Sequence, residues 1–200
     1  MSIDASAMAS LETKKRKSET AAPATKRERQ GASRPNILVT GTPGVGKTRV
    51  AEAVAARLGL ERLGVSELAK DIGAHEEFDE ERQCHVLDED RVLDAMEPKL
   101  GTGGFVVDYH ACELFPERWF DLVLVLRAGT QTLYDRLSAR NYPEPKLQEN
   151  LQCEIMQVVL EEAREAYAQG FVVELRNESE ADLEASLARV AAWRDAWNNS

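Results

Sequence analysis

Eight consecutive residues, Gly41 to Thr48, match the phosphate-binding pattern G-x-x-x-x-G-K-[ST] at every fixed position. The glycines of such a loop let backbone N–H groups turn inward around a polyphosphate, because side chains there would block its approach. The Lys47 ammonium would reach the outer phosphates, and the Thr48 hydroxyl could ligate Mg²⁺. The helix that follows adds about half a positive charge at its N-terminus. These residues predict a polyphosphate site with magnesium, and a glycine-rich turn that binds nothing is the alternative.

A second part of such a site would be an acidic residue at the end of another buried strand. Asp108 closes the apolar run of residues 105–107, and open α/β sheets bind ligands at the carboxyl ends of their strands. Magnesium is usually held by one or two carboxylates together with phosphate oxygens. His110 lies on the same side of an extended chain and could orient a water near the terminal phosphate. The alternatives are a turn or cap residue for Asp108 and a structural hydrogen-bonding group for His110.

Arginines in the second half of the chain could supply the positive charge that a transferring phosphoryl group requires. Arg136 and Arg140 are four residues apart on one predicted helix face, just before a proline-containing loop. We expect Arg136 to be a surface charge or a salt-bridge partner. Arg118 and Arg127 are candidates for gripping a second phosphate, with the same surface role as the alternative.

The three cysteines, Cys84, Cys112 and Cys153, are odd in number and widely spaced. They offer no disulfide framework, which suits a reducing compartment. Cys84-His85 and His110-Ala111-Cys112 together supply two thiols and two imidazoles. Their spacing matches no recognised zinc pattern, so buried cysteine acting as a small apolar residue is the better interpretation.

From Pro35 onward, strand and helix signals alternate, which is typical of a parallel sheet with crossover helices. The predicted strands are residues 37–40, 60–65, 105–108, 122–126 and 171–175. The predicted helices are residues 48–58, 66–71 with Ser66 as its cap, 88–100, 130–139, 147–168 and 180–197. Residues 73–87 are polar and aperiodic and predict a long functional loop. The aromatics of residues 115–120 are expected near an exposed turn.

Composition divides the chain into a basic N-terminal extension, residues 1–34, and one domain, residues 35–200. The extension holds 8 Lys and Arg against 4 Asp and Glu, so 17 of the 25 basic and 31 of the 35 acidic residues remain for the domain, a formal charge of −14. So acidic a domain is a poor non-specific binder of nucleic acid. The extension reads as disordered, and its two basic clusters fit either a bipartite nuclear-localisation signal or a solvated charge run. Neither a membrane span nor a signal peptide is expected.

Several stretches resemble one known family. They are residues 35–48, Leu87-Asp88-Glu89-Asp90-Arg91, Asp108-Tyr109-His110, Phe115-Pro116-Glu117-Arg118-Trp119-Phe120 and Gln152-Cys153-Glu154-Ile155. Over about residues 35–197 the chain is similar to adenylate kinase isoenzyme 6, also called the coilin-interacting nuclear ATPase protein. The resemblance implies an adenylate-kinase-like P-loop NTPase fold of the α/β class, with three layers and a five-stranded parallel sheet. It also implies a monophosphate-binding segment near residues 65–88 and a short lid near residues 139–149.

The resemblance further implies transfer of the ATP γ-phosphate to AMP, with Mg²⁺ as cofactor and ATP hydrolysis as a second activity. Carried over to this chain, the ATP-binding residues are Gly44, Val45, Gly46, Lys47, Thr48, Arg49, Arg140 and Asn177. The implied catalytic residues are Lys47, Asp108, His110 and Arg140, the magnesium site is Thr48 and Asp108, and the monophosphate site is Lys70, Arg118 and Arg127. Adenylate kinases usually place an arginine where this chain has Lys70, a point charge without the bidentate fork.

Biological expectations also come from the resemblance. It implies a role in maturing the small ribosomal subunit, through binding a ribosomal protein of that subunit, and a location in nucleus and cytoplasm. We expect a monomer, and direct contact with RNA stays open. The alternative function is mainly a nucleotide-switched assembly ATPase with weak kinase activity.

Overall fold

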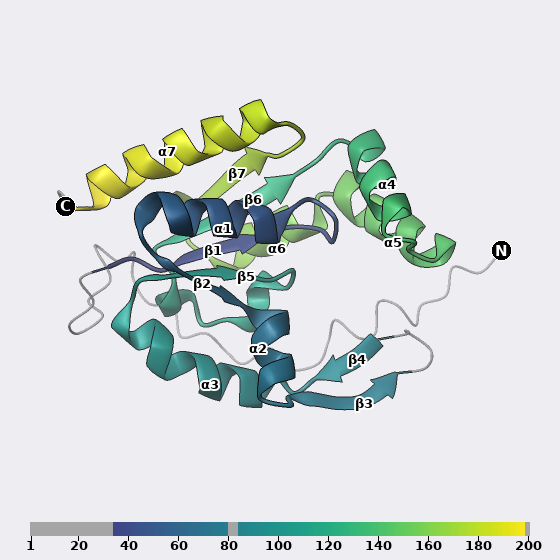
Figure 1. The fold of residues 1–200 in the computed structure, drawn as a ribbon, viewed down its shortest axis with the longest axis horizontal. Helices are drawn as coiled ribbons and strands as arrows, with labels where there is room; N and C mark the ends of the chain where they lie inside the picture. Colours follow the sequence, from purple (N-terminus) through teal and green to yellow (C-terminus); the bar gives the residue numbers. More distant parts are fainter. Residues whose placement is uncertain (1–33, 80–83, 199–200) are drawn as a thin grey trace.

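A parallel sheet forms the centre of the molecule (Figure 1). The computed structural model describes residues 34–79 and 84–198, so the predicted extension lies outside the described residues apart from Arg34. The sheet has five strands in the order β2-β5-β1-β6-β7. Their bounds are β1 Ile37–Thr40, β2 Glu61–Gly64, β5 Phe105–Asp108, β6 Leu122–Arg127 and β7 Val172–Arg176. All pairings are parallel, which confirms the predicted five-stranded sheet.

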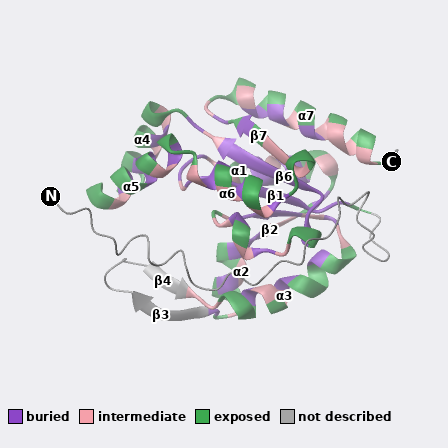
Figure 2. Cartoon of the chain, turned by 180° about the vertical axis from the view of Figure 1, so that it is seen from behind, coloured by how far each residue is buried: buried purple, intermediate pink, exposed green. Residues whose placement is uncertain are grey.

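Helices cover both faces of this sheet, because successive strand residues point to opposite sides. Ile37 and Val39 of β1 belong to one apolar core cluster, whereas Leu38 between them belongs to the other. The first cluster is closed by α1 (Lys47–Leu58), α4 (Thr130–Ala139), α5 (Glu144–Ile155) and α7 (Glu180–Asn198). The second is closed by α2 (Val65–Asp71), α3 (Glu89–Thr102) and α6 (Val158–Ala166). Figure 2 shows buried residues along the sheet and exposed ones on the outer faces of the helices. The predicted three-layer α/β fold is confirmed.

The segment from residue 73 to residue 87, predicted as a loop, contains a hairpin of two antiparallel strands, β3 (His75–Asp79) and β4 (Cys84–Leu87). The loop prediction was wrong because the segment lacks the alternation of a half-buried strand. In Figure 1 the hairpin lies below the sheet, next to α2 and α3.

The helix predicted over residues 147–168 is two helices, α5 and α6. Gln157 between them has a left-handed backbone, with φ of 60°, which no regular helix accommodates. The periodicity continues across this point, so a period-based prediction runs through it. As a result Ile155 and Met156 protrude at the corner, 60% and 65% exposed.

Two smaller predictions were also wrong. Helix α2 begins at Val65, so Ser66 lies inside it, and Gly64 takes the cap position. The aromatics Phe115, Trp119 and Phe120 are buried in the second core cluster, close to Tyr109 and Tyr167, instead of standing near an exposed turn. Within residues 34–79 and 84–198, every helix is too short or too polar to cross a membrane.

Candidate active site at the phosphate loop

The phosphate loop connects β1 to α1 at the carboxyl edge of the sheet. Gly41, Gly44 and Gly46 all have positive φ, at 143°, 97° and 98°. Lack of space excludes a side chain at these positions, in addition to the strain that a positive φ would impose on it. A Cβ on Gly44 would lie 2.7 Å from Leu133 Cδ1 of α4, and one on Gly41 would lie 2.6 Å from the Leu126 carbonyl oxygen. The loop therefore has its shape because glycine occupies these positions.

Lys47, the first residue of α1, folds its side chain back over this loop. Its Nζ donates hydrogen bonds to the carbonyl oxygens of Gly41, at 2.7 Å, and Thr42, at 3.1 Å. The pKa of Lys47 is lowered to about 8, mainly by removal from water and also by the positive charge of Arg140, while Asp108 and Glu154 act in the opposite direction. The ammonium is thus held where a phosphate would replace carbonyl oxygens as its partner.

The pKa of Lys47 predicts how nucleotide binding depends on pH. Only the protonated lysine attracts phosphate, and bound phosphate stabilises that form, so affinity should be level below about pH 8 and fall above it. The slope should approach about tenfold per pH unit. Titrating ADP into the protein from about pH 7 to about pH 9 measures this. Lys47→Arg stays charged throughout and should flatten the dependence, whereas a slope that persists in that variant would contradict the assignment.

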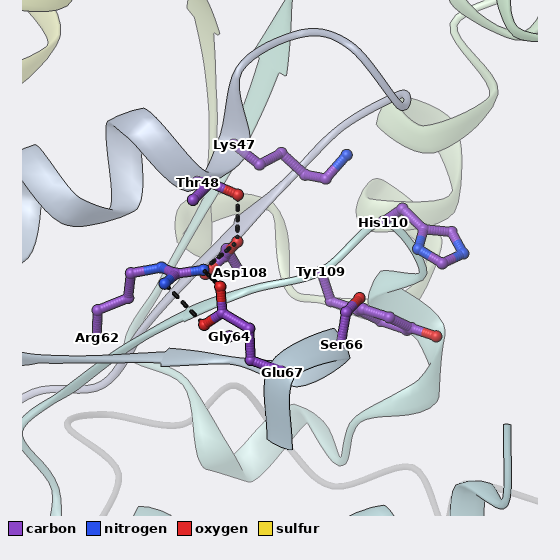
Figure 3. A pocket seen from close by; sticks show the side chains of 9 residues that line it. All are labelled: Lys47, Thr48, Arg62, Gly64, Ser66, Glu67, Asp108, Tyr109 and His110. Atoms are coloured by element: carbon purple, nitrogen blue, oxygen red, sulfur yellow. Dashed lines mark hydrogen bonds and ion pairs between the residues drawn. The ribbon is translucent and has the colours of Figure 1, made fainter. Parts of the chain in front are cut away.

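Thr48 and Asp108 meet across the end of the sheet (Figure 3). The Thr48 hydroxyl donates to Asp108 Oδ2 at 3.0 Å, and the Asp108 side chain is buried. Because the hydroxyl hydrogen is directed at the carboxylate, the lone pairs of its oxygen stay available to a cation. A hydroxyl and a carboxylate are hard oxygen donors, the type that Mg²⁺ takes. The two residues therefore fit the predicted magnesium site.

Arg62 of β2 completes this group, although the sequence analysis missed it. Its Nε donates to Asp108 Oδ1 at 2.8 Å and its Nη2 to Asp108 Oδ2 at 3.2 Å. Its Nη1 donates to Glu67 of α2 at 2.8 Å. Its strand also carries the acidic Glu61, so no local sequence signal sets Arg62 apart.

A pocket of about 130 Å³ opens next to these residues. It is lined by Lys47, Thr48, Arg62, Gly64, Ser66, Glu67, Asp108, Tyr109 and His110. Its volume is below the roughly 300 Å³ of ordinary ligand pockets, so it fits phosphate groups rather than a whole nucleotide. The side chain of His110 reaches solvent, yet nearby protein partly desolvates its imidazole. This desolvation lowers the pKa of His110, and the positive charges of Lys47 and Lys146 add to the effect. Its imidazole is therefore neutral at physiological pH.

The other side of the loop is held by Asn177 and Arg136. Asn177 Nδ2 donates to the Val45 carbonyl oxygen at 2.7 Å. Arg136 Nη1 donates to the Asn177 carbonyl oxygen at 2.9 Å and to the Val45 carbonyl oxygen at 3.3 Å. The expectation that Arg136 is a surface charge was therefore wrong: it joins α4 to the loop. Arg140 caps α4 at the predicted lid, close enough to Lys47 to lower its pKa.

The structure does not bring the remaining predicted residues into the pocket. Arg49 is exposed and forms an ion pair with Glu180 of α7. Lys70 is exposed in the last turn of α2. Arg118 pairs with Glu97 at 2.9 Å, and the neighbouring Trp119 carbonyl accepts a bond from Asn36, which precedes β1. Arg118 therefore lies at the amino edge of the sheet, opposite the phosphate loop, which does not suit a role in gripping the second phosphate.

Arg127 lies at the correct edge, but a buried carboxylate occupies its guanidinium. Its Nε donates to Glu154 Oε1 at 2.5 Å, and its Nη2 donates to the Glu154 carbonyl oxygen at 2.9 Å. The same carboxylate accepts from the Thr42 hydroxyl at 2.5 Å and from the Ala128 amide at 3.2 Å. Glu154, only 4% exposed, thus ties α5 to both the phosphate loop and β6. The sequence pattern alone assigns no role to Glu154.

Cys112 is buried, as expected of a cysteine acting as a small apolar residue. Burial raises the pKa of its thiol to about 12, which disfavours the thiolate that binds metals. The zinc interpretation also involved Cys84 and His85, whose side chains lie outside the described part of the chain.

In this five-stranded parallel sheet, β1 leads into a glycine-rich loop, a lysine and a helix, and β5 beside it ends in an acidic residue. These features define a P-loop protein of the α/β class. A family model described as an AAA domain matches residues 37–157. "Adenylate kinase isoenzyme 6 homolog" of Drosophila melanogaster is 48% identical over 164 residues, 82% of this chain and 94% of that protein. The homolog of Saccharomyces cerevisiae is 44% identical, covering 82% and 83%. The chain belongs to the adenylate kinase isoenzyme 6 family, which confirms the resemblance.

Solved structures agree on the fold. A shikimate kinase from Bacteroides thetaiotaomicron superposes with a TM-score of 0.52 at 17% identity, over 80% of this chain and 97% of that one. A shikimate kinase from Acinetobacter baumannii gives a TM-score of 0.56 at 20% identity, over 80% and 92%. At these identities the comparison shows the architecture alone.

Proposed function

We propose that this protein is a magnesium-dependent adenylate kinase, which transfers the γ-phosphate of ATP to AMP to form two ADP, with ATP hydrolysis as a second activity. The relatives named above carry adenylate kinase in their names, and a nucleotide kinase or ATPase is the class that their identity supports. The observation that carries the proposal is the grouping of Lys47, Thr48 and Asp108 around one preformed phosphate loop.

Catalysis would come from positioning and electrostatics. The Lys47 ammonium would exchange its two carbonyl partners for phosphate oxygens, and Thr48 and Asp108 would hold the magnesium, which neutralises charge developing on the phosphates. Arg140, exposed at the lid, would approach the transferring group when the lid closes. Asn177 and Arg136 would brace the loop on its other side. A neutral His110 would orient a water, which accounts for hydrolysis.

The monophosphate would bind on the α2 side of the pocket, which Ser66 and Glu67 line together with Tyr109 and His110. Lys70 on the same helix remains the proposed phosphate partner of AMP. Arg118, also expected at the monophosphate site, lies at the other edge of the sheet, away from this side of the pocket.

The kinase proposal is tested by incubating the purified protein with Mg²⁺ and ATP, with and without AMP, and following ADP and free phosphate separately. We expect AMP to be consumed with the formation of two ADP for each AMP, faster than phosphate is released. Phosphate release that is indifferent to AMP would instead make the protein chiefly an ATPase.

A second candidate function rests on the charge of the domain. A formal charge of −14 over residues 35–200 would attract a basic partner, which a small-molecule kinase does not need. We propose that the protein also acts in small-subunit maturation by binding a basic ribosomal protein, in the nucleus and cytoplasm. A purified domain that neither retains such a protein nor changes its ATPase rate with it would remove this proposal.

A further inference from the structure

Asp108 already accepts three hydrogen bonds from the protein itself. Arg62 donates to both carboxylate oxygens, at 2.8 and 3.2 Å, and Thr48 donates to one of them at 3.0 Å. This two-point contact between guanidinium and carboxylate is the strongest type of protein ion pair. The Asp108 side chain is 8% exposed and the Arg62 side chain 19% exposed, so water weakens the pair little.

The position of this pair conflicts with that of a bound metal. Water molecules in the shell of Mg²⁺ would donate to the Asp108 oxygens that Arg62 already occupies. The guanidinium also places a positive charge next to the site of a divalent cation, and such repulsion is strong where solvent is partly excluded. Arg62 and magnesium therefore compete for one carboxylate.

The side-chain contacts of Arg62 are not needed to hold β2 against β5. The two strands are already paired along their whole length, from Glu61 beside Phe105 to Gly64 beside Asp108. The guanidinium also reaches Glu67 on α2 through Nη1 and Nη2, at 2.8 and 3.2 Å. In Figure 3, Arg62 lies on one side of Asp108, and Lys47 and His110 lie on the other. Glu67 would therefore remain as a partner of Arg62 if Asp108 no longer accepted its hydrogen bonds.

We propose that Arg62 is a positioning residue that serves as an internal counter-cation of Asp108, which magnesium must outcompete when it enters with the nucleotide. Arg62 keeps the carboxylate directed at Thr48 while the site is free of metal, and it shifts toward Glu67 when the metal binds. The inference rests on the proposed assignment of Thr48 and Asp108 to magnesium, and it adds that metal affinity is set by an arginine outside the phosphate-loop motif.

The experiment measures how strongly magnesium and nucleotide binding are coupled. The Kd of a non-hydrolysable ATP analogue is determined by calorimetry in excess EDTA and in saturating Mg²⁺, for the unchanged protein, Arg62→Gln, Arg62→Lys and Arg164→Gln. The Kd in EDTA divided by the Kd in Mg²⁺ gives the strength of this coupling. Arg164 on α6 also pairs with carboxylates, Glu161 and Glu174, and lies outside the pocket, so its replacement is a matched change of charge. Thermal melting checks that each variant is folded.

We expect the ratio to rise about tenfold in Arg62→Gln, because the competing charge is gone. In Arg62→Lys, which keeps the charge, and in Arg164→Gln, it should stay within about twofold of the unchanged protein. A ratio in Arg62→Gln that is unchanged or lower would overturn the inference and leave the kinase assignment intact. A ratio near one in the unchanged protein would instead remove the magnesium assignment and the inference with it. If Arg62→Gln does not fold, the Arg62→Lys variant decides. A rise of about tenfold in this variant, which keeps the charge, would overturn the role of charge, whereas an unchanged ratio would support it.

Discussion

Replacing Lys47 with alanine should abolish phosphoryl transfer. The variant loses the one ammonium that the loop holds among its own carbonyl oxygens, at 2.7 and 3.1 Å, where charge develops during transfer. Removing a single preorganised donor typically costs about 10² to 10³ in kcat, and removing a full charge should reach at least the upper end. The rate of ADP formation from ATP and AMP at saturating Mg²⁺ measures this loss.

Two controls separate chemistry from folding in this experiment. Lys99→Ala removes an exposed lysine from the last turn of α3 and should keep the original rate. Lys47→Ala should melt at a temperature close to that of the unchanged protein, because the substitution removes a charge that burial already disfavours. A folded Lys47→Ala variant with a normal transfer rate would refute the assignment of the loop.

The second large effect concerns stability. Arg127→Ala leaves the Glu154 carboxylate, 4% exposed, without the guanidinium that contacts it at 2.5 Å. Breaking a buried ion pair from one side typically costs about 3–5 kcal/mol of unfolding free energy, since the remaining charge has no partner. Urea denaturation should show this loss. Arg118→Ala, which breaks an exposed ion pair, should cost less than about 1 kcal/mol.

The double variant Arg127→Ala with Glu154→Gln tests the cause. A neutral amide can still accept from the Thr42 hydroxyl and the Ala128 amide, and it does not need a counter-charge. The double variant should therefore be more stable than Arg127→Ala alone. If it is less stable, the loss in the single variant comes from packing rather than from the unpaired charge.

Local pattern was sufficient for the sheet and the loop. Short apolar runs next to glycine and polar breaks marked β1, β5, β6 and β7, whereas β2 begins with two charged residues. The phosphate loop is a contiguous motif whose chemistry can be read from its residue types. Asp108 could be predicted because such sheets bind ligands at the carboxyl ends of their strands. What could not be predicted depends on contacts between distant segments. Arg62 and Glu154 act through partners 46 and 112 residues away, Asp108 and Thr42, and nothing in their own neighbourhood indicates this.

The same limit explains the incorrect predictions. Nothing in the sequence distinguishes the roles of Arg118, Arg127 and Arg136. Only the topology places Arg118 at the far edge of the sheet and gives Arg127 and Arg136 their partners. The break at Gln157 is one residue of unusual backbone inside a continuous period, so it carries no periodic signal.

The central place of β1 in the sheet constrains how the chain folds during synthesis. β1 precedes the other strands of the sheet in the chain, yet its partners are β5 and β6, which end at Asp108 and Arg127. The phosphate loop therefore emerges from the ribosome long before the strands that flank it, and these pairings must close long segments of chain. Until about residue 127 has emerged, β1 lacks β6 as a neighbour. Nucleotide can thus stabilise the nascent domain only late in translation, and the apolar β1 has at most one strand neighbour until then.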